Sequence, residues 1–111
     1  MSNLIVIRTF LDLDSAQEAA VRAGDIIRLL TPCGVAKIVY SRKYKKIPEY
    51  YEVLIELRSQ THPKVVFTTV MDCLGEGWSI QCATEAIWNH DDGQAIFDEI
   101  RWIGVELIEV D

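Results

Sequence analysis

The stretch DSAQEAAVRAGDIIRLL, residues 14–30, has the spacing of an amphipathic helix and is the starting point for the fold. Ser15 and Glu18 form a capping box, in which each side chain accepts a hydrogen bond from a backbone N–H of the first turn. Pro32 and Gly34 follow the pattern and end it. We therefore predict a helix over this stretch. The apolar residues that recur at helical spacing are Ala16, Ala19, Ala20, Ala23, Ile27 and Leu30.

Strands are predicted on both sides of this helix. The stretch NLIVIRTFL (3–11) is apolar and rich in β-branched residues, which is typical of a strand. Two further stretches, VAKIVYSRK (35–43) and YYEVLIELRS (50–59), are separated by a short link that contains Pro48. Such a link favours an antiparallel hairpin. In residues 50–59 the apolar and charged residues alternate, which indicates a half-buried strand. The apolar face there is Tyr51, Val53, Ile55 and Leu57.

The second half of the chain is harder to interpret. In HPKVVFTTVMDCLGEG (62–77), the valines and threonines favour a strand, but the apolar stripe together with Pro63 and Gly75 favours a helix. We predict a helix. The alternating stretch WSIQCATEAIWN (78–89) is predicted as one strand. A short helix over 93–100 and a last strand over 101–110 follow.

This order, β-α-β-β-α-β-α-β, predicts a single α+β domain that covers residues 1–111. Its first six elements match a ferredoxin-like βαββαβ arrangement, an antiparallel sheet with the helices on one face. The C-terminal αβ unit is expected to extend that sheet. Since no other segment remains to cover the opposite face of the sheet, we expect a partner there.

Composition favours a small intracellular protein. Half of the 111 residues are hydrophobic, a quarter are charged, and no apolar run approaches the roughly 20 residues of a membrane span. The start of the chain lacks the features of a signal peptide. Three cysteines without a C-x-x-C spacing fit a reducing compartment. We predict a cytoplasmic protein that does not contact membranes.

Charge is distributed unevenly along the chain. Residues 1–60 contain nine Lys or Arg and seven Asp or Glu, whereas residues 61–111 contain two Lys or Arg and ten Asp or Glu. An acidic half repels nucleic acid and attracts a basic partner. A solvated acidic surface that serves only solubility is the alternative explanation.

The residues Asn89, His90, Asp91 and Asp92, directly before Gly93, resemble part of a metal-binding loop. An EF-hand loop has the pattern D-x-[DN]-x-[DN]-G-x5-E, and Gly93 and Glu99 match its second half. Trp88, however, stands where the first ligand is required. We instead expect Asp91 to cap the predicted helix over 93–100, and we predict neither a metal nor a cofactor.

Catalytic patterns and nucleic-acid motifs are weak. His62 and His90 are the only histidines, no Ser-His-Asp order or phosphate-binding glycine loop is present, and Cys73 and Cys82 lie in apolar patterns. We predict a protein that is not an enzyme. The stretch SRKYKKIPEYY (41–51) mixes basic and aromatic residues, as RNA-binding surfaces do. We interpret it as a charged hairpin that discourages edge pairing, and we predict no nucleic-acid partner.

Tryptophans in the acidic half are the strongest functional signal. Trp78, Trp88 and Trp102 are surrounded by carboxylates, and aromatic side chains at the centre of an acidic surface are typical anchors for a basic protein partner. Core packing is the alternative for each tryptophan. The predicted partner-binding residues are Glu85, Trp88, Asn89, His90, Asp91, Asp92, Asp98 and Trp102.

The stretch GEGWSIQCATEAIWN, followed by an acidic segment and IRWIGVELIEV, resembles immunity proteins of bacterial polymorphic toxin systems, among them those of contact-dependent growth inhibition. The resemblance covers residues 75–110 and lies in a tryptophan-bearing strand, an acidic loop and a closing strand with a tryptophan. It implies a cytoplasmic protein that binds a cognate toxin domain, such as a basic nuclease, and blocks its active site. The alternative is a ferredoxin-like regulatory or small-ligand-binding domain that acts as a homodimer.

Overall fold

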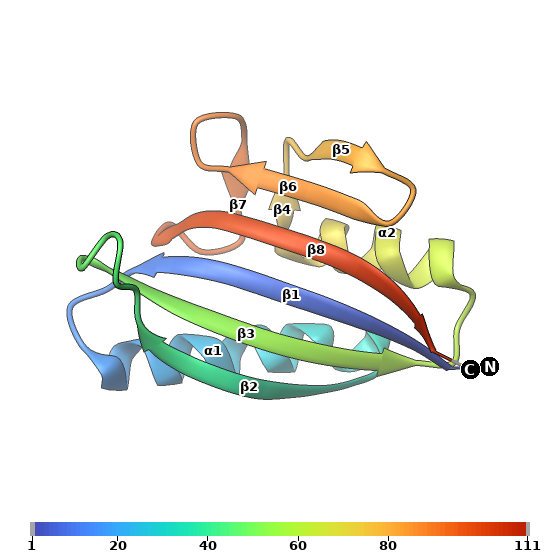
Figure 1. Ribbon diagram of the computed structural model, residues 1–111, viewed down its shortest axis with the longest axis horizontal. Coiled ribbons are helices and arrows are strands. Elements are labelled where there is room, and N and C mark those ends of the chain that lie inside the picture. Colours follow the sequence, from blue (N-terminus) through green and yellow to red (C-terminus); the bar gives the residue numbers. More distant parts are fainter. Residues whose placement is uncertain (1, 111) are drawn as a thin grey trace.

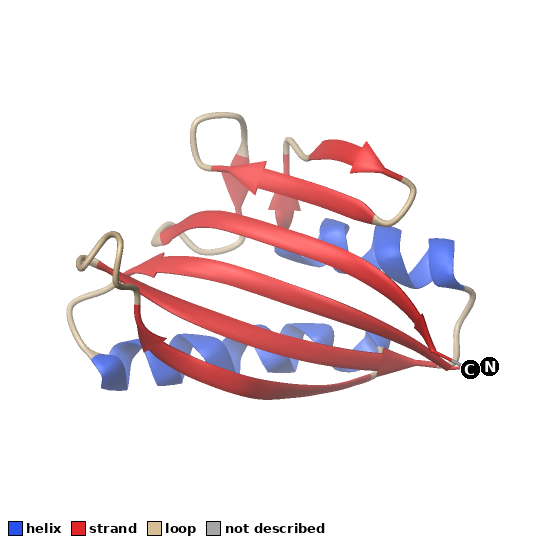
Figure 2. Cartoon of the chain, in the orientation of Figure 1, coloured by secondary structure: helices blue, strands red, loops and turns tan. Residues whose placement is uncertain are grey.

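The computed structural model describes the backbone of residues 2–110 and the side chains of residues 2–108. Within this range a six-stranded antiparallel sheet is backed by two helices, both on the same face (Figure 1, Figure 2). The strand order is β2-β3-β1-β8-β6-β5, and β4 and β7 form a separate two-stranded sheet. The elements are β1 (Ser2–Asp12), α1 (Ala16–Leu30), the 3-10 turn η1 (Thr31–Cys33), β2 (Val35–Lys43), β3 (Tyr50–Ser59), α2 (Pro63–Leu74), β4 (Gly75–Glu76), β5 (Ser79–Cys82), β6 (Glu85–Asn89), β7 (Gln94–Ala95) and β8 (Ile100–Val110).

Both long helices begin with side-chain caps. The backbone N–H of Glu18 donates to the Ser15 hydroxyl over 3.1 Å, so the predicted N-cap is confirmed. The backbone N–H of Lys64 donates to Nδ1 of His62 over 3.3 Å, directly before Pro63 in the first turn of α2. The prediction of a helix within residues 62–77 is therefore confirmed, because the proline and the apolar stripe act together against the β-branched content.

The apolar face of α1 is rotated slightly from the predicted one. Ala19, Ala23 and Leu30 are fully buried as expected, and Ile26 joins them. Ala16 and Ala20 are exposed instead. Short alanines on the flank of a helix do not reach the sheet, so their helical spacing alone did not show which of them are buried.

The core lies between the sheet and the helices. Alternate residues of β1, β3 and β8 point toward the helices, as the period of two predicts. β6 contributes Ala86 and Trp88 to the same layer. The largest fully buried side chains in the strands are Ile5, Ile7, Leu11, Ile55, Leu57, Trp88, Ile100 and Ile103.

Two predictions for residues 78–100 are wrong. The stretch 78–89 is not one strand, because a turn at Ala83 and Thr84 divides it into β5 and β6, which pair with each other. Residues 93–100 form no helix. Instead β7 pairs with β4, and the backbone N–H of Ile96 donates to the Leu74 carbonyl over 2.9 Å. A helix of only two turns could form few internal hydrogen bonds and would be marginally stable. Residues 94–96 form hydrogen bonds to the segment 74–76 instead.

The sheet topology follows from these corrections. β8, rather than the stretch 78–89, is the neighbour of β1, and the β5–β6 hairpin extends the sheet beyond β8. The α+β class and the antiparallel sheet with its helices on one face are therefore confirmed. The predicted C-terminal αβ unit is wrong, since the segment before β8 contains no helix.

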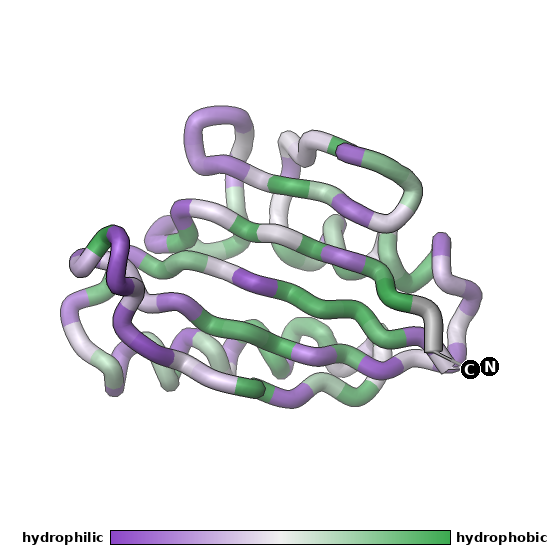
Figure 3. Tube along the Cα trace, in the orientation of Figure 1, coloured by the Kyte–Doolittle hydropathy of each residue, from purple (hydrophilic) through white to green (hydrophobic). Residues whose placement is uncertain are grey.

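The face of the sheet that points away from the helices is uncovered by any described part of the chain (Figure 1). We call it the open face. Hydrophilic residues gather at one end of it, in the β2–β3 hairpin and in the turn after β6 (Figure 3). Across the described residues, no helix is both long and apolar enough to cross a lipid bilayer.

Candidate functional site on the open face of the sheet

Aromatic side chains from three segments form a row on the open face. The Phe10 ring on β1 stacks on Tyr44 of the β2–β3 hairpin, with ring centroids 4.4 Å apart. On its other side Phe10 contacts Trp102 of β8, with centroids 5.2 Å apart. All three side chains are only half-buried. We call Tyr44, Phe10 and Trp102 the aromatic row. It places a continuous apolar surface where solvent has access.

Gly104 sets the position of the Trp102 indole. A Cβ at Gly104 would lie 2.5 Å from Cη2 of Trp102 and 3.0 Å from its Cζ3, so the ring lies against the bare backbone two residues further along β8. Any larger residue at 104 would displace the ring. The glycine therefore holds the tryptophan flat on the sheet, with its outer face toward solvent.

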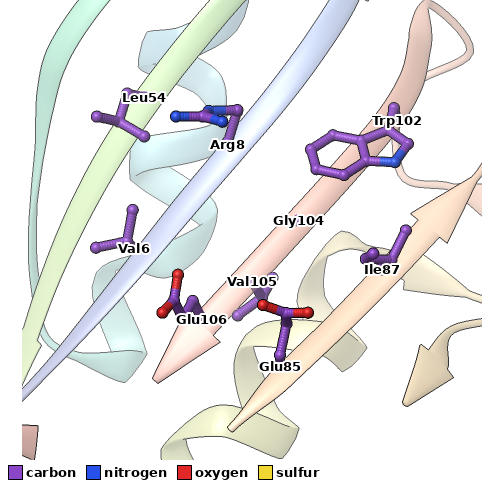
Figure 4. A pocket seen from close by; sticks show the side chains of 9 residues that line it. All are labelled: Val6, Arg8, Leu54, Glu85, Ile87, Trp102, Gly104, Val105 and Glu106. Carbon is purple, nitrogen blue, oxygen red and sulfur yellow. The ribbon is translucent and has the colours of Figure 1, made fainter. Parts of the chain in front are cut away.

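A groove lies beside the aromatic row, between β1 and β6 (Figure 4). Its volume is about 210 Å³. The apolar part of its lining includes Val6, Leu54, Ile87 and Trp102, and Glu85 and Glu106 supply carboxylates. We call this hollow the groove. Four different strands contribute to it, so it exists only in the folded sheet.

Among the described residues, charged side chains on the open face form ion pairs near β2 and β3, whereas the two glutamates on β6 and β8 do not. The buried carboxylate of Glu52 forms ion pairs with Arg8 and with Arg42, each over 3.2 Å. On β6 and β8, in contrast, Glu85 and Glu106 stand directly opposite each other. Within the described residues neither of these two carboxylates forms an ion pair. Arg8 and Arg42 are thus neutralised by Glu52, whereas the two carboxylates of the groove have no such partner in the part of the chain that the structure describes.

The structure brings several predicted partner-binding residues together. Glu85 and Asn89 lie at the two ends of β6, and Asn89 pairs with Trp102 across the β6–β8 ladder. Alternation along β6 places Glu85 and Asn89 on the open face, because Ala86 and Trp88 point into the core.

The polar turn after β6 adjoins this end of the sheet. Nδ1 of His90 lies 3.3 Å from the Arg101 carbonyl oxygen, and its Nε2 lies 3.2 Å from Oδ1 of Asp91. The Arg101 guanidinium donates to the backbone carbonyl of Asp98 over 2.6 Å. His90, Asp91, Asp92 and Asp98 are all exposed. They form a rim at the end of β6, where the chain turns back toward β7 and Asp92 lies against Gly77 beside β4.

Asp91 does not cap a helix, contrary to our expectation. Its backbone N–H donates to Oδ1 of Asn89 over 3.2 Å, and the N–H of Asp92 donates to the Asn89 carbonyl over 2.9 Å. The asparagine therefore organises a tight turn, as Asn side chains commonly do. No group of three or more His, Cys, Asp or Glu side chains in the described residues is arranged to hold a metal ion.

Trp88 is not a surface anchor, so its assignment to the partner-binding set is wrong. It is 2% exposed, and its indole N–H donates to the Glu76 carbonyl over 2.7 Å. Trp78 packs against the core and donates to the carbonyls of Met71 and Gly75. The three tryptophans therefore do not share one surface. Only Trp102 lies on the open face, because the turn at 83–84 and the strand register separate residues that are close in sequence.

Sequence reasoning missed several residues of this site. Phe10, Ile87, Gly104 and Glu106 were not singled out, and Tyr44 was assigned to the basic hairpin alone. Phe10 lies on the same side of its strand as Leu4 and Val6, so alternation alone did not mark it as a residue of the open face. No local signal shows that Gly104 adjoins Trp102 on the same face, apart from their spacing of two residues along β8.

The basic hairpin makes mainly internal contacts. The Arg42 guanidinium lies over the Tyr40 ring, 4.0 Å from its centroid, and also pairs with Glu52. Tyr44 belongs to the aromatic row. Lys45 and Lys46 remain exposed at the tip. Two of the tyrosine rings in and beside this hairpin, those of Tyr40 and Tyr44, therefore already contact neighbours within the chain.

Cysteine environments differ strongly. Burial, together with the neighbouring Cys73 thiol, raises the pKa of Cys33 to about 11. Hydrogen bonds from Thr84 lower the pKa of Cys82, which is exposed. The two histidines that could serve as bases lie in the loop before α2 and in the turn after β6, at opposite ends of the molecule (Figure 1). They cannot act together on one substrate.

These environments predict selective alkylation. At pH 8 iodoacetamide should modify Cys82 at least about 100-fold faster than Cys33, because only the thiolate reacts and a thiol with a pKa near 11 is ionised to roughly 0.1% at that pH. Peptide mass spectrometry over time measures both rates. In denaturant the difference should disappear. Equal modification rates of Cys82 and Cys33 in the folded protein would contradict these pKa assignments.

The raised pKa of Cys33 also stabilises the folded state below pH 9, and this contribution is lost as the pH rises toward 11.

No family model, no curated protein and no solved structure matches the chain.

Proposed function

We propose that this chain is a non-catalytic binding protein that docks a partner protein on the open face of its sheet. The observation that carries the proposal is the half-buried aromatic row beside the groove on a face that no described segment covers. Large aromatic side chains in a shallow, partly apolar depression are typical of the residues that contribute most to protein–protein binding. Soluble domains rarely leave such a surface without a partner.

The size of the groove favours a protein over a small metabolite. Small-molecule sites usually enclose about 300–1,000 Å³ and bury most of the ligand. The groove has about 210 Å³ and is open to solvent. A single side chain of a partner fits such a volume, and the surrounding face supplies the rest of the contact area.

The form of binding that we propose is that of an immunity protein, which neutralises a cognate toxin domain in the cytoplasm. The resemblance of residues 75–110 to such proteins suggests this role, and the location of the acidic groups supports it. The carboxylates of the groove lie on the open face, and the exposed acids of the rim lie next to it, at the end of β6. Together these acidic groups would complement the cationic active-site cleft of a nuclease. The expected contact residues are Glu85, Ile87, Asn89, Trp102 and Glu106, with His90, Asp91, Asp92 and Asp98 at the rim.

A second function is favoured by the sheet itself. The order β1-α1-β2-β3-α2-β8, with sheet order β2-β3-β1-β8, supports a ferredoxin-like unit into which β4 to β7 are inserted. Regulatory domains of this kind often dimerise through their sheets. The open face would then bind a second copy, and a metabolite could bind at the interface.

Co-expression with the product of the neighbouring gene tests the first function. We expect a one-to-one complex in size-exclusion chromatography, and we expect the neighbour to arrest growth when it is expressed without this chain. A chain that purifies alone as a dimer, and whose melting temperature rises with a metabolite, would establish the second function instead.

A further inference from the structure

The carboxylates of Glu85 and Glu106 do not stabilise the free protein, because each faces a group of the same charge. They stand directly opposite each other on neighbouring antiparallel strands, a position in which Cβ atoms are about 4.5–5.5 Å apart and like charges destabilise the sheet. Both point into the groove (Figure 4). The groove also contains Arg8, but its guanidinium pairs with Glu52, over 3.2 Å. The pair is therefore left without a cation in the described part of the chain.

The opposite side of the groove offers an aromatic surface. Trp102 lies flat over Gly104, and contact with Phe10 holds it from the side. The indole lines the same groove as the two carboxylates and is partly open to solvent. Cations bind favourably over the face of tryptophan, and arginine does so more often than lysine.

We propose that the groove receives an arginine side chain of the partner protein, which ion-pairs with Glu85 and Glu106 and stacks on Trp102. This proposal rests on the proposed function, since it names the chemistry of the partner at the same face. A planar guanidinium can donate to two carboxylates at once and also stack flat on a ring. An ammonium group can donate to two carboxylates but has no flat face to stack. A divalent metal is a poorer occupant, because Ca²⁺ needs six to eight oxygen ligands and the groove supplies two carboxylates.

A second copy of the chain is a less suitable occupant. Two arginines of its open face, Arg8 and Arg42, are already bound to Glu52. A second copy could use them only by breaking those pairs. A basic partner protein brings an unpaired arginine and complements the carboxylates of the groove.

The first test needs no partner. In the free protein at low salt, each of the single variants E85Q and E106Q should have a melting temperature about 2 °C above that of the wild type. Each substitution removes the repulsion between the facing carboxylates. The increase should shrink in 0.5 M salt, where such charges are screened. Unchanged or lower melting temperatures for both variants at low salt would overturn the proposal, since no unneutralised pair would then exist.

The second test measures partner affinity. The double variant E85Q/E106Q should bind the co-expressed partner at least about 10-fold more weakly than the wild type at 50 mM salt, and the loss should diminish as salt increases. The matched control D72N/E76Q removes two negative charges from exposed positions on α2 and β4, away from the open face. It should bind like the wild type.

The outcomes separate the two proposals. Wild-type binding that is insensitive to E85Q/E106Q overturns the arginine site and leaves the proposed function intact. A loss of equal size in the control shows a general charge effect and also overturns the site. If the chain binds only a second copy of itself, or only nucleic acid, the proposed function and the arginine site both fail.

Discussion

Replacing Trp88 by alanine should destabilise the protein by about 3–5 kcal/mol, a large loss because the indole belongs to the core. The indole is 2% exposed, and it fills the space between β6 and the β4–β7 pair. Its removal leaves a large cavity and also deprives the Glu76 carbonyl of its donor. Since domains of this size are stable by only about 5–15 kcal/mol, much of the molecule could unfold at room temperature. Urea denaturation followed by circular dichroism measures the change.

Trp88→Phe keeps the experiment informative if the alanine variant does not fold. Phenylalanine retains most of the ring and loses the hydrogen bond to Glu76, so a smaller cost of about 1–3 kcal/mol is expected. The ranking wild type, W88F, W88A is the expected result. A loss below about 1 kcal/mol for W88A would show that Trp88 does not build the core, and its place in a binding surface would have to be considered again.

Trp102→Ala should weaken partner binding by at least about 30-fold, with only a modest cost in stability. Tryptophan at the centre of an interface typically contributes 2 kcal/mol or more, and a factor of ten in affinity corresponds to about 1.4 kcal/mol. The side chain is half-buried in the free protein and contacts Phe10 on one side only, so its loss leaves no closed cavity. Isothermal titration calorimetry with the co-purified partner gives the affinity.

The matched control for Trp102 is Val21→Ala. Val21 is an exposed apolar residue on α1, 59% accessible and in the layer behind the sheet. Its truncation should change neither affinity nor stability measurably. If W102A binds like the wild type while the protein remains folded, the partner contacts another surface, such as the exposed lysines of the β2–β3 hairpin.

The first half of the fold could be predicted in detail from local patterns. The strands 35–43 and 50–59 have the bounds that alternation indicated, and α1 begins at its predicted cap. Each of these elements is long and has a single period, and each is bounded by residues that stop it. Local preference and tertiary packing agree there, so the pattern is sufficient.

The second half could not be predicted in this way. Residues 78–100 contain short strands of two to five residues, and two of them, β6 and β7, pair with β8 and β4. Gly77, with φ of 91°, permits the close approach of the segment around Asp92 and Gly93. The alternation in residues 78–89 did not show the turn at 83–84. Two short strands joined by a two-residue turn can have the same alternation of apolar and polar residues as one long strand.

The candidate site shows the same division. By itself the sequence determined that the C-terminal half is acidic and tryptophan-rich, and that a sheet with helices on one side leaves the other side open. Only the tertiary structure decided which tryptophan faces solvent and that Glu85 faces Glu106. The physical reason is strand register, which decides the face of the sheet to which each side chain points. The register of β6 against β8 is set by hydrogen bonds between the two strands, and the sequence pattern of either strand alone does not predict it.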